Sequence, residues 1–181
     1  MNSEMLQYTQ PTRTIDSDNR MVGEFAKETA GGGFSLALTT DIAIAVESAK
    51  FTMAYTKAGL TADGSSSYFL GRIVGLRRTK EMALLNPILS TRQAMEWGLV
   101  NQEVADDQVL TIALEMAHQL AKGPTRSFGE TKRLIFSSAT ESLESQMEKE
   151  SRAIASMAGS AHAREGIAAF IAKRAPEFHG E

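Results

Sequence analysis

Three consecutive glycines, Gly31, Gly32 and Gly33, stand directly before an apolar stretch in which a helix can begin near Ser35. Glycine permits positive φ angles and lets a ligand approach the backbone closely. The first turn of a helix also presents unpaired N–H groups at the positive end of the helix dipole. These groups suit an anion, including an oxyanion that exists only in a transition state. The alternative is a tight turn that joins two core segments, and the glycines alone favour that turn.

Asp63 is the second candidate for chemistry, because it is the acidic residue of a loop over residues 56–67 that is rich in glycine and serine. A single carboxylate beside a carbonyl compound can remove a proton from one carbon and return it to another. The structural alternative is that Asp63 caps the helix that follows, since Asp-Gly-Ser-Ser is a good helix-start sequence. Both roles remain open, and they do not exclude each other.

The composition limits the classes of function. The chain has 181 residues, 43% of them hydrophobic and 23% charged, which fits one folded domain. A net charge of −3 argues against a nucleic-acid footprint, and the absence of cysteine rules out disulfides and thiolate chemistry. His118, His162 and His179 have no zinc-binding spacing, and we find no membrane span or signal segment. A cytoplasmic protein without a metal or a membrane partner is expected.

Short apolar runs predict strands over residues 42–46, 50–53 and 99–104. Periodicity and stop signals predict helices over 34–40, 68–74, 77–85, 91–97, 106–122, 125–137, 141–157 and 163–175. Asp106 is expected as an N-cap or first-turn acid, and His118 is expected to be solvated. Residues 1–29 show no convincing strand, and residues 21–27 could form a short helix.

Five segments in the same order resemble the enoyl-CoA hydratase/isomerase (crotonase) superfamily. They are GGGFSLALTTD (31–41), AKFTMAYTKAGL (49–60), SSYFLGRIVG (66–75), STRQAMEWGLVNQEV (90–104) and REGIAAFIAKRAPEF (164–178). The resemblance covers roughly residue 30 to the end. It implies an α/β fold, namely a partial ββα spiral followed by a helical C-terminal region used for trimerisation.

The resemblance implies an acyl-CoA thioester as substrate, no separate cofactor, and an oxyanion hole in which Gly32 is one backbone donor. Gly31, Gly33, Ser35 and Tyr55 are then expected to line the substrate site. Lys173 or Arg174 is expected to contact a CoA phosphate, although a basic residue in a last helical turn also complements the dipole. A homo-trimer or a trimer-based hexamer is expected.

The sequence departs from the hydratases at both of their glutamates, because Ser35 and Tyr55 occupy those positions. Serine and tyrosine activate water poorly at neutral pH, so hydration is disfavoured. The isomerase branch that includes the epoxyphenylacetyl-CoA isomerases carries an aspartate where Asp63 stands, although its usual preceding proline is Ala62 here. The favoured hypothesis is therefore an isomerase with Asp63 and Gly32 as catalytic groups.

The third departure concerns residues 1–29, which lack the loop that supplies the family's first oxyanion N–H. A truncated product or a divergent member without half of its site is expected. We therefore assign residues 1–29 to an arm or remnant, 30–104 to a partial spiral core with the acyl-CoA site, and 105–181 to the helical region. The alternatives are a non-catalytic member that acts through oligomerisation, a hydratase, and, ranked low, a hydrolase that uses Ser35 as nucleophile.

Overall fold

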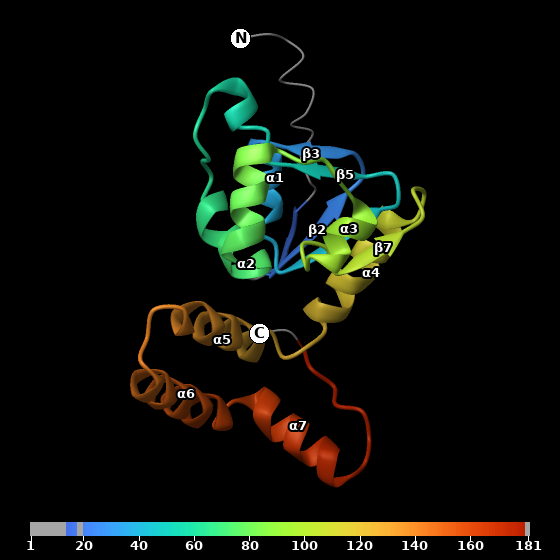
Figure 1. Cartoon of the computed structure of the whole chain (residues 1–181). Helices are drawn as coiled ribbons and strands as arrows, with labels where there is room; N and C mark the ends of the chain where they lie inside the picture. The colour runs from blue at the N-terminus through green and yellow to red at the C-terminus, as the bar shows by residue number, and fades with distance from the viewer. Residues whose placement is uncertain (1–13, 18–19, 180–181) are drawn as a thin grey trace. The chain divides into compact units, whose positions relative to one another are not determined.

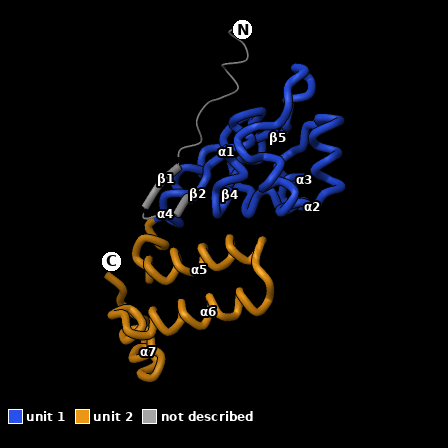
Figure 2. Tube along the Cα trace, turned by 90° about the vertical axis from the view of Figure 1, so that its left-hand side faces the viewer, with its two compact units in different colours: residues 1–117 blue, residues 118–181 orange. Residues whose placement is uncertain are grey.

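The computed structural model describes residues 14–17 and 20–179 (Figure 1). The chain divides into two compact units, residues 1–117 and 118–181, which are treated separately here (Figure 2). The boundary lies later than the 104/105 division expected from the sequence. The start of α4 (Val109–Ala121) explains the difference, because Val109 and Ala113 are buried core residues of the first unit.

The first unit contains two small sheets. The larger has the order β1-β2-β4-β7, formed by Thr14–Ser17, Arg20–Phe25, Ile42–Val46 and Gln102–Val104. The pair β1 and β2 is antiparallel, whereas β2, β4 and β7 run parallel, with Val22 opposite Ile42 and Ile44 opposite Gln102. Parallel inner strands are covered on both faces, which explains why β4 is a continuous apolar run.

The second sheet has the order β3-β5-β6, formed by Glu28–Ala30, Lys50–Thr52 and Leu89–Ser90. Phe25 of the first sheet and Phe51 of the second meet edge to face, with ring centroids 6.0 Å apart. Both rings are buried, so part of the core of this unit lies between the two sheets.

The prediction for residues 1–29 was wrong where the structure describes them. Residues 14–17, 20–25 and 28–30 form strands, and the short helix expected over 21–27 is absent. A short inner strand cannot be distinguished from a helix by periodicity, because its partner strands and not its own pattern specify it. Gly23 also packs closely: a Cβ there would lie 2.7 Å from Thr40 Cγ2. Residues 1–13 lie outside the described residues.

Most helices of the first unit begin and end close to their predicted positions. These helices are α1 (Gly32–Ala37), α2 (Ser66–Leu85), α3 (Thr91–Glu96) and α4, whereas the 3₁₀ turn η1 (Thr56–Ala58) lies in the segment that was expected to be a loop. The expected break within 68–85 is confirmed, because Gly75 has φ 78° and ψ 160° inside α2. Ser90 and Gln93 form a reciprocal capping box at the start of α3.

Asp106 does not cap α4, which corrects the expectation for this residue. Its carboxylate accepts hydrogen bonds from Ser48 N at 3.3 Å and Ser48 Oγ at 2.5 Å, and so ties the turn after β4 to the segment after β7. The carboxylate therefore bonds Ser48, a tertiary partner, and not the backbone at the start of α4. His118 is exposed on α4, as predicted.

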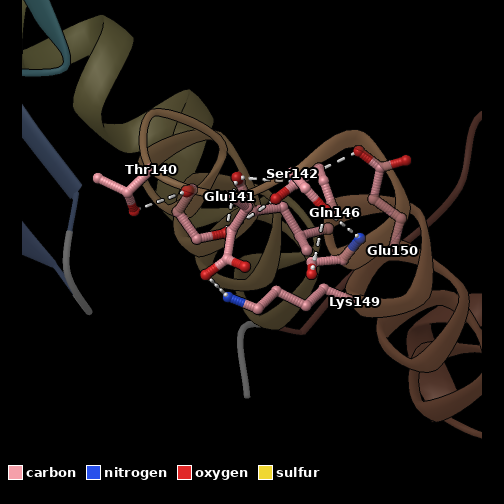
Figure 3. Close-up of polar contacts among 9 residues, drawn as sticks. Thr140, Glu141, Ser142, Gln146, Lys149 and Glu150 are labelled. Carbon is pink, nitrogen blue, oxygen red and sulfur yellow. Dashed lines mark hydrogen bonds and ion pairs between the residues drawn. The ribbon is translucent and has the colours of Figure 1, made fainter.

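The second unit consists of α5 (Thr125–Ser138), α6 (Leu143–Ala158) and α7 (Ala161–Ile171). Polar side chains fix the connection between α5 and α6 (Figure 3). Gln146 Nε2 donates to the carbonyl of Leu134 at 3.0 Å, and Lys149 pairs with Glu141 at 2.6 Å. Large apolar side chains remain exposed on α6 and α7, among them Ile154, Phe170 and Ile171.

None of the described helices is both long and apolar enough to cross a lipid bilayer.

Candidate active site

The glycine turn presents unpaired backbone donors at the start of α1. Gly31 has φ 53° and ψ −125°, precedes α1, and donates its N–H to the carbonyl of Met53 at 3.2 Å. Within the described part of the chain no acceptor takes the N–H of Gly32, and a Cβ built there would meet no atom within 4 Å. Gly33 lies in the first turn of α1. Neither Gly32 nor Gly33 has a described acceptor for its N–H, and Gly32 is the one that the family resemblance names as an oxyanion donor.

Tyr55 is fixed to the same carbonyl as the glycine turn, because Tyr55 N also donates to Met53 O, at 2.8 Å. The intervening residue, Ala54, has φ 57°, a left-handed conformation that non-glycine residues seldom adopt. The chain therefore turns sharply after β5 (Lys50–Thr52) and directs the phenol of Tyr55 towards α1. Such strained positions persist where the surrounding structure holds them.

Ser35 connects the glycine turn to the Asp63 loop. Ser35 lies one helical turn beyond Gly32, and its side chain is only 1% exposed. Ser35 Oγ lies 2.7 Å from Tyr55 OH, 3.1 Å from Asp63 O and 3.3 Å from Gly31 O. The structure therefore brings together residues that are 28 positions apart in the sequence.

Asp63 uses its carboxylate for Tyr55 and not for capping α2. The phenol O–H of Tyr55 donates to Asp63 Oδ1, while the N-cap of α2 is Ser65, which makes no side-chain cap bond. The backbone carbonyl of Asp63 accepts from Ser66 N at 3.0 Å and Ser66 Oγ at 2.8 Å. The cap interpretation of Asp63 was therefore wrong, since the tertiary contact with Tyr55 takes the side chain.

Burial raises the pKa of the Tyr55 phenol above 10, and the hydrogen bond to Asp63 raises this pKa further. At neutral pH Tyr55 is thus an uncharged O–H donor. Asp63 itself is exposed, and no described residue bonds its second oxygen, Oδ2. The arrangement leaves one carboxylate oxygen held by the protein and the other accessible.

The environment of Ser35 argues against a serine nucleophile. Its neighbours within bonding distance are a phenol and two backbone carbonyls, none of which is a general base of the kind that activates serine. Its burial also denies a substrate access to Oγ.

Two contacts that sequence reasoning missed hold the Asp63 loop. Ser66 is fully buried and bonds the Asp63 carbonyl. Gly64 has φ 55° and lies against Ser35, where a Cβ would come 2.8 Å from Ser35 Cβ. Both residues belong to the Asp-Gly-Ser-Ser sequence. Ser66 makes a local bond three residues back, whereas the role of Gly64 depends on its tertiary contact with α1.

Gly64→Ala is expected to destabilise the first unit, because alanine there is both strained and in collision with Ser35. The left-handed conformation costs about 1–2 kcal/mol and overpacking adds roughly 1–3 kcal/mol. Thermal unfolding measures the effect, and each kcal/mol corresponds to about 2–4 °C in Tm for a chain of this size. Gly59→Ala is the matched control, because Gly59 has φ 69° but open space around it. Equal losses of Tm in the two variants would show that the contact with Ser35 contributes nothing.

Lys173 and Arg174 belong to the second unit and follow α7. Arg174 makes two hydrogen bonds with Glu165, at 2.6 and 2.9 Å. These bonds are the main reason why the pKa of Glu165 falls to about 2, and they raise the pKa of Arg174. Lys173 has φ 53° and is exposed. Of the two cations, Lys173 is thus the one for which no described residue supplies a carboxylate in direct contact.

Among the described residues, no group of three or more His, Cys, Asp or Glu side chains is arranged to hold a metal ion. The groups that the structure does assemble are a backbone N–H at a glycine turn, two hydroxyls and one accessible carboxylate. These are the kinds of group that acid–base chemistry and oxyanion binding use, and an α/β fold carries them.

Comparison with known proteins gives the family. Residues 13–181 match enoyl-CoA hydratase/isomerase, so the chain belongs to that family and carries a crotonase-like fold with a helical C-terminal region. The match begins well before residue 30, where the sequence motifs began. It therefore includes the strands β1 to β3 that sequence reasoning missed.

Two curated relatives and one solved structure illustrate the similarity. The chain is 44% identical over 153 residues to 1,2-epoxyphenylacetyl-CoA isomerase of Escherichia coli K12, covering 84% of this chain and 58% of the relative. It is 37% identical over 143 residues to 4-chlorobenzoyl coenzyme A dehalogenase-1 of an Arthrobacter species, covering 79% and 52%. The enoyl-CoA hydratase/isomerase structure from Cupriavidus metallidurans CH34 aligns with a TM-score of 0.83 at 30% identity, over 88% and 60% of the two chains. The chain thus spans little more than half the length of the curated relatives.

Proposed function

We propose that this chain moves a double bond, or carries out a related rearrangement, in an unsaturated acyl-CoA. The observation that carries the proposal is the bonding of the Asp63 carboxylate. Tyr55 donates to Oδ1, whereas no described residue bonds Oδ2. Ser35 lies within bonding distance of the Asp63 and Gly31 carbonyls and so connects the Asp63 loop to the glycine turn. Family membership supports a CoA thioester as the substrate, and the relative from Escherichia coli is named an isomerase of an acyl-CoA. No cofactor beyond the coenzyme A of the substrate is part of the proposal.

The proposed reaction needs one proton carrier. Asp63 takes a proton from a carbon of the acyl chain, and the electrons of the broken C–H bond pass into the enolate of the thioester. The Gly32 N–H stabilises the negative oxygen of that enolate. Asp63 then returns the same proton to another carbon, so the protein is unchanged at the end.

Hydration is the alternative within the family, and the two side chains at the family's glutamate positions argue against it. Ser35 is buried, and Tyr55 is a phenol whose raised pKa makes it a weak acid and keeps it from acting as a base at neutral pH. An assay with an α,β- and a β,γ-unsaturated acyl-CoA, following double-bond migration and water addition separately, tests the proposal. Water addition faster than migration would contradict it.

A second candidate is substitution at an acyl-CoA in which Asp63 acts as a nucleophile, a role that carboxylates fill in several enzyme classes. The relative named 4-chlorobenzoyl coenzyme A dehalogenase and the free Asp63 Oδ2 favour this candidate. Release of chloride from 4-chlorobenzoyl-CoA, without double-bond migration in the first assay, would favour it over the isomerase. A chain that binds no acyl-CoA in calorimetry would instead support the non-catalytic hypothesis.

The proposal includes self-association as a trimer or a trimer-based hexamer. The exposed apolar residues of α6 and α7 support it, since Phe170 and Ile171 are 84% and 75% exposed in the single chain. Light scattering at micromolar concentration is expected to give a multiple of the monomer mass, and Phe170→Ser combined with Ile171→Ser is expected to lower that mass. A monomer mass for the unmodified chain would contradict this part of the proposal.

Lys173 is the candidate contact for a CoA phosphate, because Arg174 is already paired with Glu165. A cytoplasmic location is also part of the proposal, and the cysteine-free sequence is compatible with a reducing compartment.

A further inference from the structure

Ser35 and Tyr55 each carry a single hydroxyl proton, yet their oxygens lie near several acceptors. Tyr55 OH is within bonding distance of Ser35 Oγ and Asp63 Oδ1. Ser35 Oγ is near Tyr55 OH and two backbone carbonyls. Since one hydroxyl can donate only one hydrogen bond, the direction of each bond can be worked out by counting protons.

An ionised Asp63 carboxylate only accepts, so the bond between Tyr55 and Asp63 Oδ1 must use the proton of Tyr55. The contact of 2.7 Å between Ser35 Oγ and Tyr55 OH then requires the proton of Ser35. The resulting order is Ser35 to Tyr55 to Asp63, with the donor at each step defined.

The backbone carbonyls near Ser35 do not compete strongly for its proton. Gly31 O already accepts from Ser35 N at 3.0 Å, and Asp63 O already accepts from Ser66 N and Ser66 Oγ. Both carbonyls also lie farther from Ser35 Oγ than Tyr55 OH does. Ser35 is therefore free to donate to the phenol, and this bond turns the proton of the phenol towards Asp63.

We propose that Tyr55 is the positioning residue of Asp63, oriented by Ser35, and that it holds Oδ1 so that Oδ2 is the atom which exchanges the proton with the substrate. This inference rests on the proposed function of Asp63 as the acid–base group. It gives Ser35 and Tyr55 a supporting role behind the carboxylate, in place of the substrate contact expected from the sequence.

The chemistry of the phenol suits this role. A neutral phenol with a raised pKa donates a hydrogen bond without giving up its proton, so Asp63 remains a carboxylate able to act as base. Burial of Ser35 and Tyr55, at 1% and 9% exposure, keeps water from replacing either hydroxyl. A carboxylate held at one oxygen also loses less freedom when the substrate binds.

Tyr55→Phe tests the proposal, because it removes the donor and keeps the buried ring. The expected result is a loss of about 10- to 100-fold in kcat, the range typical of removing a partner behind a functional side chain, with KM changed less than about 3-fold. Tyr68→Phe is the control, since it removes a phenol of α2 that lies outside the Ser35–Tyr55–Asp63 chain. Ser35→Ala leaves the Tyr55 donor in place and is expected to reduce kcat less than Tyr55→Phe does.

A second measurement needs no substrate and no folded Tyr55→Phe variant. Ultraviolet absorbance follows the ionisation of the three tyrosines, and subtracting the curve of Tyr55→Phe or of Asp63→Asn isolates Tyr55, whose pKa is raised by burial and by Asp63 in the unmodified chain. In Asp63→Asn this titration is expected at lower pH, because the negative charge that opposes the phenolate is gone while the burial remains. A titration of Tyr55 that is the same in both proteins would overturn the proposed contact.

The outcomes separate the inference from the proposed function. Loss of isomerisation in Asp63→Asn with full kcat in Tyr55→Phe would overturn the positioning role and leave the proposed function intact. Isomerisation that survives Asp63→Asn would overturn the proposed function itself, whatever Tyr55→Phe does. A fall of the apparent kcat that matches the fraction of unfolded protein, with KM unchanged, would show that Tyr55 is only a packing residue.

Discussion

Asp63→Asn is expected to abolish double-bond migration while acyl-CoA still binds. Asparagine keeps the size of the side chain and an oxygen that Tyr55 can donate to, but it cannot take up a proton from carbon. General acid–base groups contribute about 10²- to 10⁴-fold in rate, and Asp63 is the accessible carboxylate that the structure places beside Ser35 and Tyr55. Steady-state assays of migration, together with calorimetry of acyl-CoA binding, measure the two effects separately.

Asp107→Asn is the control for this experiment, because it makes the same chemical change at an exposed carboxylate before α4. Its activity is expected to equal that of the unmodified chain. A loss of acyl-CoA affinity as large as the loss of rate in Asp63→Asn would mean that the carboxylate serves binding and not proton transfer.

The second large effect is expected at Gly32, whose role depends on a backbone N–H and not on a side chain. Gly32→Pro removes that N–H, and proline is well tolerated at the first position of a helix, which Gly32 occupies in α1. No described acceptor uses the N–H, so the substitution breaks no hydrogen bond of the fold. Loss of one oxyanion donor typically lowers the rate by about 10²- to 10³-fold, and kcat is expected to fall by that amount.

Gly32→Ala separates the N–H from the glycine itself. A Cβ at Gly32 meets no atom within 4 Å, and its φ is not in the left-handed region, so alanine fits and keeps the donor. The activity of Gly32→Ala is expected to stay within a few-fold of the unmodified chain. Equal losses in the alanine and proline variants would assign the effect to crowding near the substrate and not to the lost N–H.

Local sequence signals were sufficient for some elements. The apolar run of β4 predicted its bounds, residues 42–46, because a strand covered on both faces is apolar along its whole length. Gly75 predicted the break in α2, because its φ of 78° is one that a side chain would resist.

Tertiary partners decided the features that the sequence did not predict. β2 is a strand because β1 and β4 pair with it, and nothing in its own pattern requires that. Asp63 and Asp106 both looked like helix caps, yet each gives its carboxylate to a side chain outside the helix that follows it, Tyr55 and Ser48 respectively. The local sequence shows whether a carboxylate could cap the next helix. It does not show which donor from elsewhere in the chain the fold brings close enough to bond that carboxylate instead.

The pairing of β4 with β7 determines when the first unit can finish folding. Ile44 and Gln102 are far apart in the chain, and Asn101 Oδ1 accepts from Ala43 N at 2.8 Å across the same distance. The chain loses conformational entropy when it closes so long a loop, and the hydrogen bonds form only after that loss. This contact therefore slows folding. In the second unit, α5 packs on α6 and α6 on α7, and such sequence neighbours assemble quickly. On the ribosome, the segment from Gly31 to Ser66 therefore leaves the exit tunnel before the strand that completes its supporting sheet, and it must wait for that strand.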